Sequence, residues 1–186
     1  PTFIQRGLHG TAAAIRVLAG FDSTYNEQLR KLLLYLENIE ALEKEGEMFE
    51  GLGRDLNNVI KNSEILYALS YIHSGTANTE KLKELISAKL FGSKNMDGGW
   101  SYFTDVEEDS DMYFTASVYL SLRSHNYNSL QNTKEFLIEK LKKYKKDDIP
   151  DPTTFSKLCF IVYTFVKLDE HRKNKETKKL LVDVFN

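Results

Sequence analysis

Cysteine and proline are both scarce in this chain. Among its 186 residues there are one cysteine, Cys159, and three prolines. A lone cysteine excludes an internal disulfide and a thiolate metal cluster, and it fits a reducing compartment such as the cytoplasm. Because Cys159 lies within an apolar run, we interpret it as a core residue rather than a nucleophile.

Long apolar runs and a strong net charge are also missing. The longest apolar stretch, residues 158–166, is too short to span a bilayer. The formal net charge of -2 argues against a nucleic-acid-binding protein, and we interpret the basic stretch 140–146 as a solvated helix end. The chain begins with Pro1 and not with methionine, so we expect a processed piece or part of a larger protein.

Helical periodicity runs along almost the whole chain, and no convincing alternating pattern typical of strands occurs. The sequence therefore predicts an all-α protein in a single helical-repeat domain, residues 1–186. We expect about four helical hairpins, at residues 8–44, 56–90, 111–145 and 152–184.

One residue marks where a predicted helix begins, and another marks where a predicted helix ends. Pro152 suits a first helical turn, where its missing amide donor has no consequence. Gly92 stands where a helix would end with a positive backbone angle.

The chain also repeats itself at an interval of about fifty residues. Two sets of residues recur at equivalent positions in successive expected helices. The first set is Thr11, Ser63 and Thr115, and the second, one helical turn later, is Ile15, Tyr67 and Tyr119. A period of this length that holds two helices is typical of a stacked array of α-hairpins.

Two motifs indicate a family. Residues 97–100 read Asp-Gly-Gly-Trp, and residues 111–116 place Asp, Thr and Ala at the start of an expected helix. These motifs resemble those of the α/α-toroid superfamily, which includes terpenoid cyclases, protein prenyltransferase β-subunits and complement-type thioester domains. The resemblance implies hairpins wound into inner and outer helices, as an α/α array or partial α/α toroid. Lys94 occupies the family's Gln position, so the Gln–Trp stack of the family is incomplete.

The same resemblance implies a candidate acid. Cyclases of the protonating type use an Asp-x-Asp-Asp motif, and the nearest stretch here is Asp109-Ser110-Asp111-Met112, which lacks the last acid. Asp111, with Asp109, is therefore the candidate for general-acid catalysis. The alternative is that these acids cap a helix, whose N-terminal dipole favours anions.

No metal or cofactor site is predicted. The resemblance to prenyltransferases implies a zinc site built from Asp, Cys and His, but the spacing of Cys159 and His171 does not support one. Residues 7–10, Gly-Leu-His-Gly, resemble a repeat of lanthionine cyclases, which makes His9 a second candidate. A surface or capping role for His9 is the alternative.

Aromatic residues supply the remaining site candidates. Tyr67, Tyr113 and Tyr119 fall at positions where the resemblance implies the inner face of the array, and Trp100 of the Asp-Gly-Gly-Trp motif is a further candidate for ligand binding. Aromatic faces there could hold a ligand or stabilise a carbocation. Alternatively, they simply fill the space between helix layers.

Four hairpins would not close a ring of the family's usual size. We therefore expect an open arc that binds a protein, a peptide or a hydrophobic small molecule on its inner face, without catalysis. The alternative is a fragment of a cyclase- or prenyltransferase-like enzyme that uses Asp111 as its acid. The sequence leaves open whether the protein is an enzyme.

Overall fold

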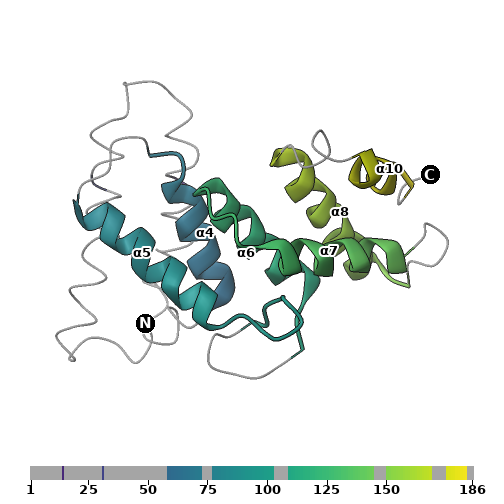
Figure 1. Cartoon of the computed structure of the whole chain (residues 1–186), viewed down its shortest axis with the longest axis horizontal. Helices are drawn as coiled ribbons and strands as arrows, with labels where there is room; N and C mark the ends of the chain where they lie inside the picture. The colour runs from purple at the N-terminus through teal and green to yellow at the C-terminus, as the bar shows by residue number, and fades with distance from the viewer. Residues whose placement is uncertain are drawn as a thin grey trace. The chain divides into compact units, whose positions relative to one another are not determined.

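A computed structural model describes five segments of the chain, residues 58–72, 77–102, 109–144, 150–168 and 175–183, together with Ala14 and Lys31. These segments contain six helices and no strand, which confirms the all-α prediction (Figure 1). The helices are α4 (Val59–Leu69), α5 (Ala77–Gly92), α6 (Met112–Ser124), α7 (Gln131–Lys143), α8 (Pro152–Lys167) and α10 (Lys175–Asp183). None of these described helices is long and apolar enough to cross a membrane.

The predicted hairpin at residues 8–44 lies outside the described residues, apart from Ala14 and Lys31, which are both helical. The other helices occupy the segments where the periodicity places them. Their arrangement as a single array or partial toroid remains a prediction.

The described helices belong to two compact units that divide between Ser93 and Lys94. In the first unit, α4 packs against α5 and buries Leu66, Leu69 and Leu90. Their burial supplies the apolar core of this helix pair.

In the second unit, α6 packs against both α7 and α8, and α7 also contacts α8 and α10 (Figure 1). The largest side chains buried in this unit are Trp100, Tyr119 and Phe165. The rings of Tyr119 and Phe165 meet edge to face with centroids 6.0 Å apart, which joins α6 to α8.

Side-chain caps explain where three helices begin. Asn58 precedes α4 and accepts a hydrogen bond from the Lys61 amide at 3.1 Å. Asp111 caps α6, and Asp151 caps α8. Each carboxylate or amide oxygen satisfies amide donors that the first helical turn leaves without an intrahelical partner.

Pro152 takes the first-turn position predicted for it. The expectation of a positive backbone angle at Gly92 is wrong. Gly92 is the last residue of α5, and Gly98 is the described glycine with a positive φ, at 90°. A helix can end in an ordinary backbone conformation when the following residues turn by other means, so the glycine at this position is not required.

The cap of α8 makes the stability of the protein depend on pH. The Thr154 hydroxyl donates to Asp151 at 2.7 Å and the Thr154 amide at 2.9 Å. These two bonds, the side-chain bond first, lower the pKa of the Asp151 carboxyl below its ordinary value of 3.8.

We expect the stabilisation by Asp151 to be complete above the unfolded-state pKa and to disappear as the pH falls through the lower folded-state value. Thermal unfolding from about pH 6 to about pH 2 should therefore show wild type losing stability relative to Asp151→Asn as the acid protonates. The asparagine retains a capping oxygen but does not titrate, which makes it the matched control. A stability difference that stays constant over this range would contradict the assignment.

Candidate functional site

The Asp-Gly-Gly-Trp motif forms a tight turn before α6. The Gly98 amide donates to the Asn95 carbonyl at 3.0 Å, and the Asn95 amide donates to the Gly99 carbonyl at 2.9 Å. The Asp97 carboxylate accepts from the Gly99 amide at 3.0 Å and from the Ser110 hydroxyl at 2.6 Å. The acid of the motif thus holds the turn closed and ties it to the residue that precedes the cap of α6.

The turn is also bonded to the starts of α6 and α7. The Trp100 amide donates to the Thr115 hydroxyl at 2.9 Å, and the Trp100 carbonyl accepts from the Asp111 amide at 2.9 Å. The Thr133 hydroxyl of α7 donates to the Gly98 carbonyl at 2.8 Å. Thr115 and Thr133 are fully buried, so these bonds satisfy polar groups that have no access to water. We call this turn, with Ser110, Thr115 and Thr133, the glycine junction.

Both glycines of the junction are required by its geometry. A Cβ atom on Gly99 would lie 2.5 Å from the Cβ of Ser110 and 2.9 Å from the Thr115 hydroxyl oxygen. Gly98 has a φ of 90°, and a Cβ there would lie 2.9 Å from the Asn132 carbonyl oxygen. Only residues without a side chain permit so close an approach of this turn to both helices.

Lys94 stands over the indole of Trp100. Its ammonium nitrogen lies 5.6 Å from the ring centroid, within the range of a cation–π contact. Burial lowers the pKa of Lys94 below its ordinary value. Lys94 therefore covers one face of the tryptophan ring at the glycine junction.

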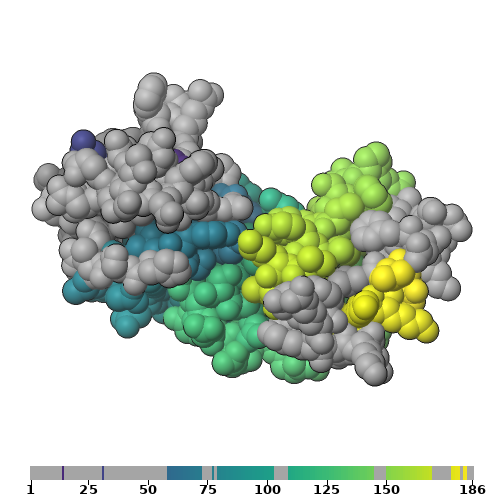
Figure 2. Space-filling model, turned by 90° about the horizontal axis from the view of Figure 1, so that it is seen from above, coloured from purple at the N-terminus to yellow at the C-terminus, as the bar shows by residue number. Residues whose placement is uncertain are grey.

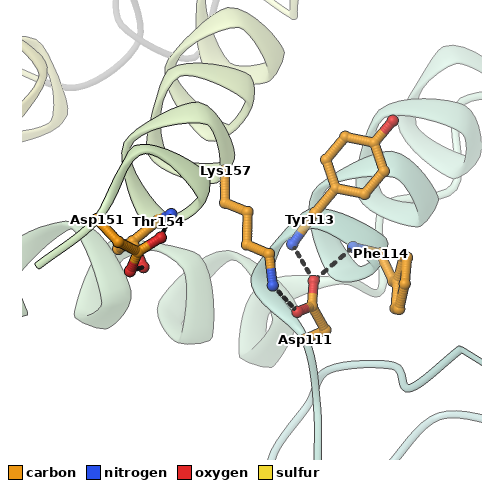
Figure 3. A network of polar contacts seen from close by, with 6 residues as sticks. All are labelled: Asp111, Tyr113, Phe114, Asp151, Thr154 and Lys157. Carbon is orange, nitrogen blue, oxygen red and sulfur yellow. Dashed lines mark hydrogen bonds and ion pairs between the residues drawn. The ribbon is translucent and has the colours of Figure 1, made fainter.

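The Asp111 carboxylate is engaged on both of its oxygens (Figure 3). Oδ1 accepts from the amides of Tyr113, at 2.7 Å, and of Phe114, at 3.3 Å. Oδ2 forms a hydrogen-bonded ion pair with the Lys157 ammonium, which reaches it from α8. Asp111 therefore caps α6, as the structural alternative predicted, and in addition links α6 to α8.

A continuous row of aromatic rings runs from the turn across α6 to α8. Ring centroids of neighbours in this row lie between 4.7 and 6.0 Å apart. In order, the row consists of Tyr102, Phe114, Tyr113, Phe160 and Tyr163. We call it the aromatic ladder. Its two ends are exposed, Tyr102 at 40% and Tyr163 at 45%, and the three rings between them are half-buried.

The remaining predicted site residues do not gather on the ladder. Trp100 is fully buried within the glycine junction, and Tyr119 is buried against Phe165. Tyr67 is buried in α4, where its hydroxyl lies 2.9 Å from that of Tyr71. Asp109 is exposed.

His9 lies outside the described residues. Of the predicted ligand-binding residues, Tyr113 is the one that the structure places in the ladder.

Sequence reasoning missed Lys157 as the partner of Asp111. The two residues are 46 positions apart, and no pattern connects them. One signal was present, since Lys157 is the sole charged residue between the cap of α8 and the end of its apolar run.

Among the described residues, no group of three or more His, Cys, Asp or Glu side chains is placed to hold a metal ion. Comparisons with protein-family models, with curated proteins and with solved structures find no match for this chain.

The glycine junction leads to a test of packing. We expect Gly99→Ala to destabilise the protein by about 1 to 3 kcal/mol, because the new methyl group would overlap Ser110 and Thr115. Gly92→Ala is the matched control, since no atom lies within 4 Å of its added Cβ. That variant should be neutral or stabilised by up to about 1 kcal/mol. Urea unfolding measures the stability of both variants. Equal changes in stability would contradict the close approach of Gly99 to Ser110 and Thr115.

Proposed function

We propose that this protein is a non-catalytic helical-repeat module that binds an apolar polypeptide segment on the aromatic ladder. The module is similar to the hairpin arrays of terpenoid cyclases and protein prenyltransferases. The ladder is the observation that supports binding, because a contiguous row of partly exposed rings is unusual on a protein surface without a partner. The single half-exposed cysteine fits a reducing compartment, so the proposal includes the cytoplasm.

A polypeptide fits the ladder better than a small molecule does. Small-molecule sites are concave and bury most of the ligand surface. The ladder instead passes over two helices and is exposed at both ends, at Tyr102 and Tyr163. An extended or helical segment can lie along such a row and cover several rings at once.

Repetition of the inner-helix pattern supports the proposed array. Ser63 in α4 and Thr115 in α6 are both fully buried near the starts of their helices. One turn later, Tyr67 and Tyr119 are both buried as well. Residues in register in the sequence therefore have the same burial in two different helices, as stacked hairpins require.

The enzymatic alternative depends on Asp111 as a proton donor. A general acid must present a proton to its substrate. Both oxygens of Asp111 instead accept hydrogen bonds, from two amides and from the Lys157 ammonium. This arrangement favours the non-catalytic proposal.

The ladder can be tested with defined probes. One is a fluorescein-labelled amphipathic peptide with leucines at i, i+3, i+4 and i+7, and the other is a proline-rich peptide. We expect wild type to bind at least one of them, and Tyr113→Ser to weaken that binding about tenfold or more, as loss of a buried aromatic anchor does. Fluorescence anisotropy measures the affinities.

Tyr127→Ser is the matched control, because Tyr127 is a half-buried tyrosine that follows the other end of α6. An equal loss of peptide affinity in Tyr113→Ser and Tyr127→Ser would contradict the proposal, and so would the absence of binding of either peptide to wild type. Binding of the apolar dye 8-anilinonaphthalene-1-sulfonate alone, lost in Tyr113→Ser, would instead indicate a small hydrophobic ligand.

The catalytic alternative has its own test. We expect Asp111→Asn to remain folded and to bind like wild type, because asparagine retains the capping oxygen and the loss of the ion pair costs about 1 kcal/mol. Asp111→Ala should lower the free energy of unfolding by about 1 kcal/mol more, because it also removes the cap of α6. Incubation with isoprenoid diphosphates followed by mass spectrometry measures turnover. A product that wild type forms and Asp111→Asn does not would overturn the non-catalytic proposal.

A further inference from the structure

Two neighbouring helices of the second unit carry exposed lysines. Helix α10 packs against α7, and Figure 1 shows it near the C-terminal end of α7. The exposed lysines are Lys142 and Lys143 at the end of α7, and Lys178 and Lys179 in α10. Figure 2 shows α10, in yellow, at the surface of the molecule. We call these four residues the lysine patch. The packing of the two helices thus adds a second lysine pair to the basic stretch 140–146.

The ammonium groups of the lysine patch are not neutralised by neighbouring acids. Among the described residues, none of the four makes an ion pair with a carboxylate. The ammonium of Lys143 instead lies over the ring of Tyr144, 5.6 Å from its centroid, and that of Lys140 lies over Phe136 at 4.7 Å. An aromatic ring attracts a cation without cancelling its charge. The patch therefore presents a positive field to solvent.

Two exposed acids lie near the patch on the same helices. Glu139 is one turn before the lysines of α7, and Asp183 is one turn after those of α10. The remaining charged residues of α10, Lys175 and Glu176, have opposite signs. Four exposed lysines therefore outnumber two exposed acids, and the patch has a net positive charge.

The helix dipole accounts for the lysines of α7 but not for those of α10. Lys142 and Lys143 lie in the last turn of α7, where the negative end of the dipole favours cations. Lys178 and Lys179 lie in the middle of α10, whose last turn has no basic residue. A second lysine pair beside the first increases the mutual repulsion within the folded protein. An anionic partner relieves this repulsion when it binds.

The residue types of the patch fit a surface of many mobile anionic groups. The sequences of α7 and α10 contain lysine and no arginine. Arginine binds phosphate or carboxylate in a fixed bidentate geometry, whereas lysine is a point charge on a flexible stem. Flexible point charges do not require an anion at one fixed position, which suits the headgroups of an anionic lipid bilayer.

An exposed apolar side chain lies beside the lysines of α10. Val182 is 50% exposed, and it follows Lys178 and Lys179 by one turn on the same outward side of the helix. Thr177, at about 140° around the helix from Val182, is buried. A bilayer offers anionic headgroups to the lysines and a hydrocarbon boundary to the valine. A nucleic-acid backbone offers only the first, so Val182 favours the lipid surface.

We propose that the lysine patch of α7 and α10 attaches the protein to the surface of an anionic lipid bilayer, with Val182 at the boundary of the hydrocarbon. The described helices lie on the membrane in this arrangement and do not cross it. Four lysines are at the lower end of what holds a protein on such a surface. The attachment is therefore reversible and is weakened by salt.

The inference is independent of the proposed function. The lysine patch shares no residue with the aromatic ladder. Tyr113→Ser should bind vesicles like wild type, and variants of the patch should bind peptide like wild type. Either proposal can therefore fail while the other stands.

Sedimentation with lipid vesicles tests the proposal. The probes are phosphatidylcholine vesicles without and with about 30% phosphatidylserine, in about 0.1 M salt. We expect wild type to bind the phosphatidylserine vesicles about tenfold or more strongly than the neutral ones. Most of this binding should disappear at about 0.5 M salt, because screening shortens the range of the charges. Equal binding to both kinds of vesicle, or binding to neither, would overturn the proposal.

Two double variants locate the contact. Lys142→Gln/Lys143→Gln and Lys178→Gln/Lys179→Gln should each weaken binding to the phosphatidylserine vesicles about tenfold or more. The variant of α10 leaves the last turn of α7 unchanged, so its effect is separate from any fraying of α7. Near-wild-type helicity by circular dichroism should accompany both results, since glutamine is a good helix former.

Lys81→Gln/Lys83→Gln in α5 is the matched control. It removes the same charge from a helix that belongs to the first unit. It should weaken binding by no more than about threefold, through the change in net charge alone. A loss in this control equal to that of the patch variants would show that net charge, and not the patch, determines binding.

The position of Val182 is tested by Val182→Trp with vesicles of brominated lipids, which quench tryptophan fluorescence near the hydrocarbon. The natural Trp100 is fully buried, so quenching reports on the introduced side chain. We expect quenching in Val182→Trp and little in wild type. Unquenched fluorescence of vesicle-bound Val182→Trp would overturn the proposed orientation.

A different partner would give a different pattern. Salt-sensitive binding of a DNA duplex of about 20 base pairs, lost in both patch variants and without binding to vesicles, would identify a nucleic-acid surface. Binding of polyglutamate with the same dependence on the patch, again without vesicle binding, would identify an acidic polypeptide. Either result would overturn the assignment to a bilayer.

Discussion

The backbone of Trp100 holds the start of α6 in place. Its amide donates to the buried Thr115 hydroxyl and its carbonyl accepts from the Asp111 amide, so one residue is bonded to the cap and to the first turn of the helix. This contact is possible because Gly99 has no side chain that would collide with Ser110 and Thr115. Since Asp111 in turn pairs with Lys157, the position of α8 also depends on this turn.

The Asp111–Lys157 ion pair gives Asp111 a second structural role, because the residue that caps α6 also links α6 to α8. The start of a helix is a favourable place for an acid, because its oxygens accept from the free amides of the first turn and its charge complements the helix dipole. The pair is about one-quarter to one-third exposed, with side-chain exposures of 25% for Asp111 and 31% for Lys157. At such partial burial its main effect is to orient α8 on α6 rather than to add much net stability.

Helix α8 contributes apolar side chains to two different parts of the second unit. Its buried face joins the core through Phe165, and its flank continues the aromatic ladder through Phe160 and Tyr163. The same helix also exposes Phe155 and Val166.

Local features of the sequence determined the helices and their caps, because these depend on residues only a few positions apart. The helical period predicted the all-α fold, and Pro152 marked the first turn of α8. Tertiary structure decided which aromatic residues are core, since Tyr119 is buried while Tyr113, on the same helix, joins the ladder. Likewise, only the packing of α8 on α6 could bring Lys157 to Asp111, 46 positions away in the chain. Such contacts arise from the relative placement of helices, which local periodicity does not specify.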